Sequence, residues 1–497
     1  MKTKALVILL SLVMVITIVS YSARANDEVQ DFSERKPSMS LGVFSVPFTE
    51  GKASAHVQPG DIVAVFSTAS NTEQDYTYSI RGDLTDSNSK TGNLQMKSST
   101  PADYQLAVQT RPLESGQYDA GSSSEQNKEK KPDIGNRDTF WTWDLTDLSS
   151  LPNIGSVQMV GILMAIGTYC DVFTDEHSRL TVQDAEDIAR QFDSIAYPVV
   201  TQYFGDPPDV NGNSRVTILL PLAFNGGYDN EPNPQGFSFG AFNDKDQLPP
   251  SPENPYSNYR NVLYLNPGAF NTTNPDFQDK WRSILSHEFQ HMVNYRYHKN
   301  LEAVAIDEGK AMLAEILSGY GLPHGDYLMW ANVDQYQKNP ACVSLLQTDY
   351  SFEDALATYG MGIMWVSYLF DRFGKETFYS IATNPLPGLD GAESVTGLSK
   401  ENLFAEWVQA NIVNGTVNDP LFRYHTINVI GDGDGLYYKA LDGFAARPEQ
   451  EIPTVETQRQ VPSYGVEYFR AVAPELVIIT GNNIRVFIIS QERELPH

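Results

Sequence analysis

The feature that most constrains the fold is an H-E-x-x-H sequence at residues 287–291. His287 and His291 are four residues apart, so on an α-helix their imidazoles share one face, roughly 6 Å apart along the axis. Glu288 stands beside the first imidazole, where its carboxylate can reach a water on a metal held by both. Apolar residues recur around the motif at helical spacing and predict a buried helix: Trp281, Ile284, Leu285, Phe289 and Met292.

A second predicted helix carries the acids that such a metal needs. A catalytic zinc has three protein ligands and a water, so two histidines leave it one ligand short. Glu308 lies seventeen residues after His291, and Glu315 lies seven residues further, on the same helix face. Glu308 is the candidate third ligand, and Glu315 a candidate hydrogen-bond partner of a ligating imidazole. The alternative is that both are ordinary acids of an amphipathic helix.

These residues resemble the gluzincin metallopeptidases, in which a second helix carries an (Asn/Asp)-Glu-Gly sequence whose Glu is the third zinc ligand. Asp307-Glu308-Gly309 matches that piece. Three segments together resemble the secreted bacterial hyicolysin-type neutral metallopeptidases: Ser286-His287-Glu288-Phe289-Gln290-His291-Met292, Asp209-Val210-Asn211-Gly212-Asn213 and Tyr359-Gly360-Met361-Gly362. The resemblance covers about residues 165–414. It implies that His287, His291 and Glu308 bind Zn²⁺, with Asp307 and Glu315 just outside the ligands.

Tyr359 is a candidate donor to the oxyanion of the reaction. In aminopeptidase-type gluzincins, a Tyr near a helix start has this role, and the chemistry needs a neutral donor aimed at developing negative charge. The chain has 26 tyrosines, so a core tyrosine is the alternative. His298 and His324 are other possible donors. No Gly-x-Met-Glu-Asn exopeptidase sequence precedes the motif, and the spacing from His291 to Glu308 is shorter than in aminopeptidases. The missing exopeptidase sequence and the shorter spacing both favour an endopeptidase.

Two further sets of residues could bind a metal or form a cross-link. Asp209, Asn211 and Asn213 place oxygen atoms around a glycine, like half of a calcium loop, but the same residues also suit a turn before a strand. Ca²⁺ is therefore a second candidate cofactor. Cys170 and Cys342 have no metal-site spacing, and they are compatible with a disulfide or with two free thiols.

The N-terminus has the features of an export signal. Lys2 and Lys4 precede an apolar run, and a small-x-small sequence ends at Ala25, which predicts a signal peptide over residues 1–25. A membrane anchor is the alternative, but the run is shorter than the roughly 20 apolar residues of a span. We expect a secreted monomer without stable membrane insertion. The net charge of −27 argues against nucleic acid as a partner.

The pattern of elements predicts an α+β chain. Residues 26–165 alternate between apolar and polar and predict a β-sandwich-like domain, with a mobile loop over 113–137. Residues 166–414 predict a zincin-like catalytic domain made of a small sheet and a helical active-site region. Residues 415–497 predict a C-terminal β-rich module.

Two local expectations accompany this division. Arg81-Gly82-Asp83 is expected to form a hairpin turn, since Gly-Asp suits one. The predicted strand over residues 261–265 comes shortly before the H-E-x-x-H helix, so we expect it to be the sheet edge on which an extended peptide lies.

The sequence therefore predicts a secreted zinc metalloendopeptidase that acts on peptide or protein substrates, with Glu288 as the base. One alternative is an exported binding or adhesion protein with an inactive metallopeptidase core. The other is a zinc hydrolase of non-peptide substrates, because the same activated water also attacks esters.

Overall fold

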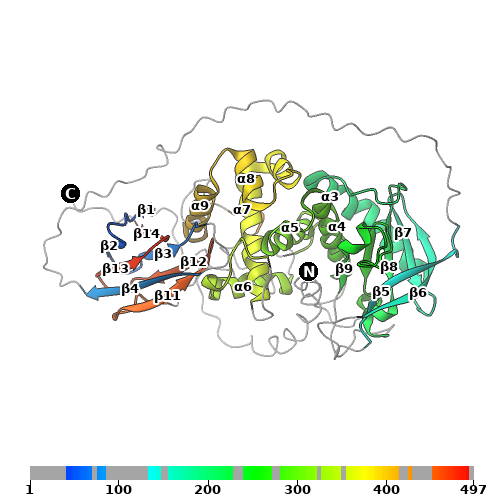
Figure 1. Ribbon diagram of the computed structural model, residues 1–497, viewed down its shortest axis with the longest axis horizontal. Coiled ribbons are helices and arrows are strands. Elements are labelled where there is room, and N and C mark those ends of the chain that lie inside the picture. Colours follow the sequence, from blue (N-terminus) through cyan, green and yellow to red (C-terminus); the bar gives the residue numbers. More distant parts are fainter. Residues whose placement is uncertain are drawn as a thin grey trace, which may run out of the picture.

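Helices and sheets both contribute to the structure, a computed structural model, in agreement with the α+β class. A β-sandwich lies at one end, helices fill the middle, and a six-stranded sheet lies at the other end (Figure 1). The expected signal peptide, His324 and residues 113–132 of the expected loop lie outside the described residues. The structure describes residues 41–69, 75–84, 133–146, 155–227, 239–270, 280–321, 326–348, 354–413, 424–427 and 450–491.

The six-stranded sheet has the order β5-β6-β7-β8-β10-β9. Its strands β7, β8 and β10 are parallel, whereas β5, β6 and β9 run antiparallel to their neighbours. The strands are β5 (Arg137–Asp144), β6 (Gly155–Ile166), β7 (Cys170–Asp175), β8 (Val216–Leu220), β9 (Gly240–Phe242) and β10 (Val262–Leu265). The strands β5 and β6 were expected in the N-terminal domain, but they pair with the sheet that precedes the H-E-x-x-H helix.

The edge of this sheet differs from the prediction. The strand β10 is internal, because β8 pairs with one side of it and β9 with the other. The outer strand is therefore β9, which reaches β10 through an antiparallel pairing of Leu263 with Phe242. The expectation of an edge strand over residues 261–265 was wrong, because the short strand β9 pairs with β10 and forms the edge itself.

Helices pack on this sheet and on one another. Thr181 caps α2 (Val182–Gln191) through a capping box with Asp184, as its position before an acidic first turn predicts. A π-helical segment, Phe192–Ala196, joins it to α3 (Tyr197–Phe204), which has Pro198 in its first turn. The remaining helices are α4 (Lys280–His298), α5 (Val304–Leu317), α6 (Tyr327–Lys338), α7 (Ala355–Ala382), α8 (Gly388–Thr396) and α9 (Lys400–Val413). None of the described helices is long and apolar enough to cross a membrane.

Glycines let α7 approach two other helices closely. A Cβ atom at Gly309 of α5 would lie 2.3 Å from the carbonyl oxygen of Gly362 on α7. One at Gly360 would lie 2.1 Å from the carbonyl oxygen of Asn332 on α6. Side chains at these positions would push the helices apart. Gly309 directly follows Glu308, and Gly360 directly follows Tyr359, so the helices that carry these two residues can pack closely.

The sandwich is built from both ends of the chain. Its sheets have the orders β1-β14-β3-β12 and β11-β4-β13-β2, so N-terminal and C-terminal strands alternate within each sheet. The strands are β1 (Leu41–Ser45), β2 (Lys52–Val57), β3 (Ile62–Phe66), β4 (Tyr76–Leu84), β11 (Thr457–Val461), β12 (Val466–Arg470), β13 (Glu475–Gly481) and β14 (Arg485–Gln491). The strands β1 to β4 and β11 to β14 therefore do not form separate N-terminal and C-terminal β units, because they hydrogen-bond to each other.

The Arg81-Gly82-Asp83 segment is also not a turn. It lies inside β4, where Arg81 is opposite Ile478 and Asp83 is opposite Leu476 of β13. Pairing with this strand keeps the segment extended, and the expected hairpin was wrong.

One sheet of the sandwich is buried on both faces. In β3, Ile62, Ala64 and Phe66 belong to the core shared with the helices, whereas Val63 and Val65 face the second sheet. The rings of Phe66 and Phe404 of α9 lie 6.0 Å apart, and the hydroxyl of Tyr468 donates to the carbonyl of Val408. Burial on both sides explains why β3 is a continuous apolar run and not an alternating one.

Candidate metal centre

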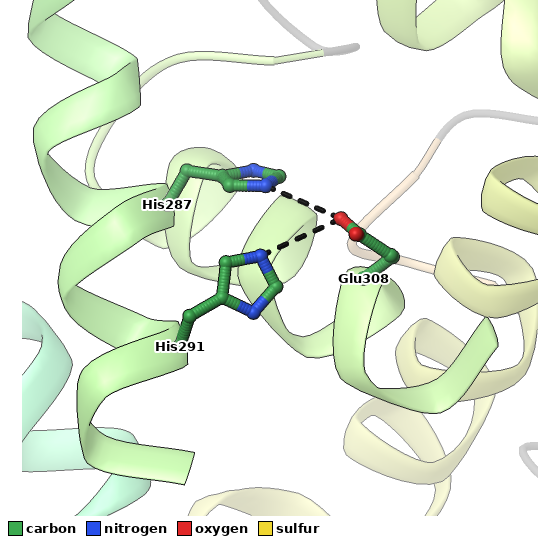
Figure 2. Close-up of side chains that lie close together, drawn as sticks. All are labelled: His287, His291 and Glu308. Carbon is green, nitrogen blue, oxygen red and sulfur yellow. Dashed lines mark ion pairs between the residues drawn. The ribbon is translucent and has the colours of Figure 1, made fainter. Parts of the chain in front are cut away.

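Two helices bring the three predicted ligands together. His287 and His291 lie one turn apart on α4, and Glu308 faces them from the first turns of α5 (Figure 2). Their ligand atoms all lie within 4.8 Å of one another. The distances from Glu308 Oε2 to the Nε2 atoms are 3.4 Å for His287 and 3.5 Å for His291.

This arrangement fits a bound divalent cation. Both distances exceed those of a good N–H···O hydrogen bond, and the buried Oε2 of Glu308 makes no hydrogen bond to the described residues. Such an unsatisfied buried carboxylate oxygen is costly unless another group contacts it. Two imidazoles and a carboxylate are a donor set that Zn²⁺ takes in catalytic sites. The three residues could therefore hold Zn²⁺ and leave a fourth position open.

A carboxylate lies beside the far nitrogen of each imidazole. Nδ1 of His287 is 2.8 Å from Glu315 Oε1, and Nδ1 of His291 is 3.1 Å from Asp307 Oδ1. A carboxylate at Nδ1 favours the tautomer that has its proton there, so the Nε2 lone pair faces Glu308. Glu315 thus lies beside an imidazole, as its predicted role requires, and Asp307, predicted only to lie just outside the ligands, lies beside the other imidazole.

Behind these carboxylates lie residues that the sequence analysis missed. Lys280 donates to Glu315, while Asn294 donates to Asp307 over 2.7 Å. Lys310 is buried and donates to Asn294 Oδ1 and, over 2.6 Å, to Glu302. The available signal was a lysine within an apolar helical stretch, because a buried lysine requires an acceptor.

The charges of the centre affect one another strongly. Burial lowers the pKa of His287, but the neighbouring carboxylates of Glu308 and Glu315 outweigh it and raise that pKa to about 9. Burial raises the pKa of Glu308, but the two imidazoles beside it, His291 first, outweigh burial and hold the pKa far below its usual range. For Glu288, burial dominates and raises the pKa, which suits a group that must take up a proton.

A cavity of about 120 Å³ opens in front of the ligands. Glu288 and Tyr359 both line it, together with the three ligands. Tyr359 comes from the start of α7 and is 6% exposed. Ala241 and Phe242 of the edge strand β9 form another part of the wall. The cavity therefore brings a carboxylate, a phenol and a strand edge next to the metal ligands.

Other candidate residues lie elsewhere or have other partners. His298 is buried, with Nε2 2.7 Å from the carbonyl oxygen of Asn384, and it does not line the cavity. The carboxylate of Asp209 accepts from the N–H and hydroxyl of Ser214, and Asn213 accepts from the N–H of Arg215. These bonds close the turn before β8, and the structure gives no support for the expected Ca²⁺.

The two cysteines are free thiols, with Cys170 buried and Cys342 half-buried. The disulfide that the sequence left open is therefore not formed.

No protein-family model matches the chain. The chain is similar to the neutral metalloprotease ShpI of Staphylococcus hyicus, with 30% identity over 147 residues. The similar region covers 27% of this chain and 31% of that protein, so less than a third of either takes part. Together with the cluster of His287, His291 and Glu308, this likeness supports a protease that binds a metal.

Proposed function

We propose that the protein is a secreted, zinc-dependent metalloendopeptidase. The observation that carries the proposal is the unsatisfied Oε2 of Glu308, which lies between two Nε2 atoms in a cavity that Glu288 also lines. His287, His291 and Glu308 would hold the ion. When bound, Zn²⁺ supplies a Lewis acid that acidifies a water and polarises the scissile carbonyl. The likeness to a neutral metalloprotease supports the same class of reaction.

Glu288 is the proton carrier in this proposal. It takes a proton from the attacking water and delivers it to the leaving amine, so one carboxylate serves as base and then as acid. The raised pKa of Glu288 brings its proton affinity closer to that of the water and the amine with which it exchanges the proton. Burial in the cavity also keeps bulk water from competing for that proton.

The edge strand β9 provides a place for an extended substrate. Ala241 and Phe242 line the cavity, and a Cβ atom at Gly240 would lie 3.2 Å from Cγ of Glu288. A peptide that pairs with the outer side of β9 would pass directly in front of the base. Binding through main-chain hydrogen bonds does not require a free chain end, which favours an endopeptidase.

Tyr359 is the proposed donor to the oxyanion. It lines the cavity from α7, whereas the ligands come from α4 and α5. The close helix crossing at Gly309 and Gly362 holds Tyr359 in place relative to Glu308.

The test compares casein hydrolysis by the protein without residues 1–25 and by its Glu288→Gln variant, with zinc content measured on both. We expect Glu288→Gln to retain zinc and to lose about 10²- to 10⁴-fold in rate. Glu186→Gln, on the exposed face of α2, is the matched control and should hydrolyse casein normally.

Unchanged hydrolysis by Glu288→Gln would refute the role of this base. Zinc in the wild type without cleavage of any peptide would favour a binding protein or a hydrolase of non-peptide substrates. Secretion is checked by the mass of the protein recovered from the medium, which should lack residues 1–25.

A further inference from the structure

Lys280 is a buried cation two helical turns before His287. It begins α4, and its side chain is 11% exposed. Its ammonium donates to Glu315 Oε2 over 2.8 Å and also to Asp326 Oδ2. Seven residues separate Lys280 from His287, so both project from the same side of the helix. A buried lysine thus lies on the metal-facing side of α4, although it touches no ligand.

Glu315 connects Lys280 to the metal centre. The lysine contacts Oε2, and Nδ1 of His287 contacts Oε1 of the same carboxylate. Because a carboxylate is planar, a contact that holds one oxygen also sets the direction of the other. The rotation of the Glu315 side chain, and through it the orientation of the His287 ring, therefore depends on Lys280.

Asp326 holds the lysine from the other side. Its Oδ1 atom accepts from the N–H groups of Leu328 and Met329, which caps the N-terminus of α6. Its other oxygen accepts from Lys280. The chain of contacts thus runs from the start of α6 to His287, and every side chain in it is at most 11% exposed.

We propose that Lys280 is a positioning residue of the metal centre: through Glu315, it orients the His287 imidazole for metal binding. The inference rests on the proposed function, because it requires a metal at His287. An ion pair kept only for stability is the competing explanation. Buried ion pairs contribute little stability compared with apolar replacements, so a geometric role accounts better for a lysine at this position.

The test measures zinc affinity in the metal-free, folded chain by competition with a chromophoric chelator. We expect Lys280→Met to bind zinc about 10- to 100-fold more weakly than the wild type, as is typical when a partner of a ligating His is lost. Lys280→Arg should recover most of the affinity, since its guanidinium can also donate to a carboxylate. The absorption spectrum of the cobalt-loaded protein should change in Lys280→Met, because it reports ligand geometry and not stability.

Lys338→Met is the matched control. Lys338 also forms an ion pair with a buried acid, since its Nζ lies 2.6 Å from Asp334 on α6, but this pair does not contact Glu315. We expect the zinc affinity and the cobalt spectrum of Lys338→Met to equal those of the wild type.

A second variant covers the case in which Lys280→Met does not fold. Lys280→Met with Glu315→Gln removes both charges, which is better tolerated than removal of one. If Lys280 acts through Glu315, the double variant binds zinc no more weakly than Glu315→Gln alone. An independent, multiplied loss would overturn the inference, and so would wild-type affinity in folded Lys280→Met.

The same measurements separate this inference from the proposed function. A wild type that binds zinc but cleaves no peptide would refute the peptidase and leave the role of Lys280 intact. A wild type that binds no zinc would overturn both.

Discussion

His287 and His291, the two candidate metal ligands on α4, make the same kind of contact at Nδ1, but the partners of these contacts have different surroundings. The partner of His287, Glu315, has a side chain only 4% exposed and is held by the ammonium of Lys280. The partner of His291, Asp307, has a side chain 35% exposed and accepts from the neutral amide of Asn294. A carboxylate out of reach of water thus has a cation beside it, whereas a partly hydrated one has an amide.

The cation on the His291 side lies one step further away. Asn294 donates to Asp307 through Nδ2 and accepts from Lys310 through Oδ1. The carboxylate of Glu302 balances the charge of Lys310 and also lies 3.0 Å from Nδ1 of His298. Asn294 therefore connects Asp307 to a buried ionic cluster, of which Glu302 also lines the cavity. The His287 side is therefore the more deeply buried of the two, while Asp307 remains accessible to water.

The largest effect should come from the residue that both sides share. Glu308→Ala removes the carboxylate that faces both Nε2 atoms, and the partners of the imidazoles stay in place. We expect zinc affinity to fall by more than the roughly 10- to 100-fold typical of losing a partner of a ligand. Metal analysis after dialysis is the measurement. A metal content equal to that of the wild type would remove Glu308 from the ligands.

Tyr359→Phe should affect the rate and leave both sides of the metal centre unchanged. Tyr359 lines the cavity from α7, whereas the two histidines and the carboxylates at their Nδ1 atoms belong to α4 and α5. Loss of one oxyanion donor typically lowers kcat by about 10²- to 10³-fold. We expect such a loss in peptide hydrolysis with unchanged zinc affinity. A normal kcat would assign Tyr359 to packing alone.

Removing one charge from each side tests the comparison itself. Glu315→Gln leaves Lys280 beside a neutral amide in a closed site, whereas water can solvate the site of Asp307→Asn. We expect zinc affinity to fall about 100-fold for Glu315→Gln and about 10-fold for Asp307→Asn, the two ends of the typical range. Chelator competition measures both. Equal losses would show that burial does not distinguish the two sides.

The last effect is on the free energy of unfolding and not on the metal centre, and it concerns a buried carboxylate whose described partners are neutral. Asp246 is fully buried and accepts from the N–H of Asn258 and the hydroxyl of Tyr264. Burial dominates over these bonds and raises its pKa to about 6. Because the folded state then holds this proton more tightly than the unfolded state, the free energy of unfolding falls as pH rises from about 4 to about 6. The loss is about 3 kcal/mol and is complete above that range.

Asp246→Asn removes this titration. Relative to the variant, the wild type should lose stability between about pH 4 and pH 6. The opposite trend is expected for Glu315, because burial raises its pKa but the charge of Lys280 outweighs burial and lowers it. Urea unfolding of both proteins at several pH values checks this. A stability difference that does not change with pH would contradict the raised pKa.

Helical periodicity is the part of the structure that could be predicted most closely. His287, Glu288 and His291 lie on one helix, and Glu308 and Glu315 lie on the next, at separations of one or two turns. Such spacing is local, so neighbouring residues alone decide which side chains share a face. The strand β3 could also be identified locally, because it is a run of five consecutive apolar residues.

Strand partners could not be predicted from local patterns. Alternation shows that a segment is extended, but it contains no information about which other segment completes its hydrogen bonds. The pairing of β1 with β14 joins residues at opposite ends of the chain, and β9 replaces β10 at the sheet edge. Both features depend on contacts between segments that the sequence separates widely.

By itself, the sequence determined the two candidate histidine ligands and the base, because one helical turn places them together whatever surrounds the helix, whereas Glu308 comes from the next helix. Only the tertiary structure decided which groups hold those side chains in place. Lys280, Asp326 and Asn294 contact the carboxylates because α4, α5 and α6 pack against one another, and no spacing along the chain encodes these contacts. The chemistry of the site is therefore local, whereas its geometry is a property of the packed core.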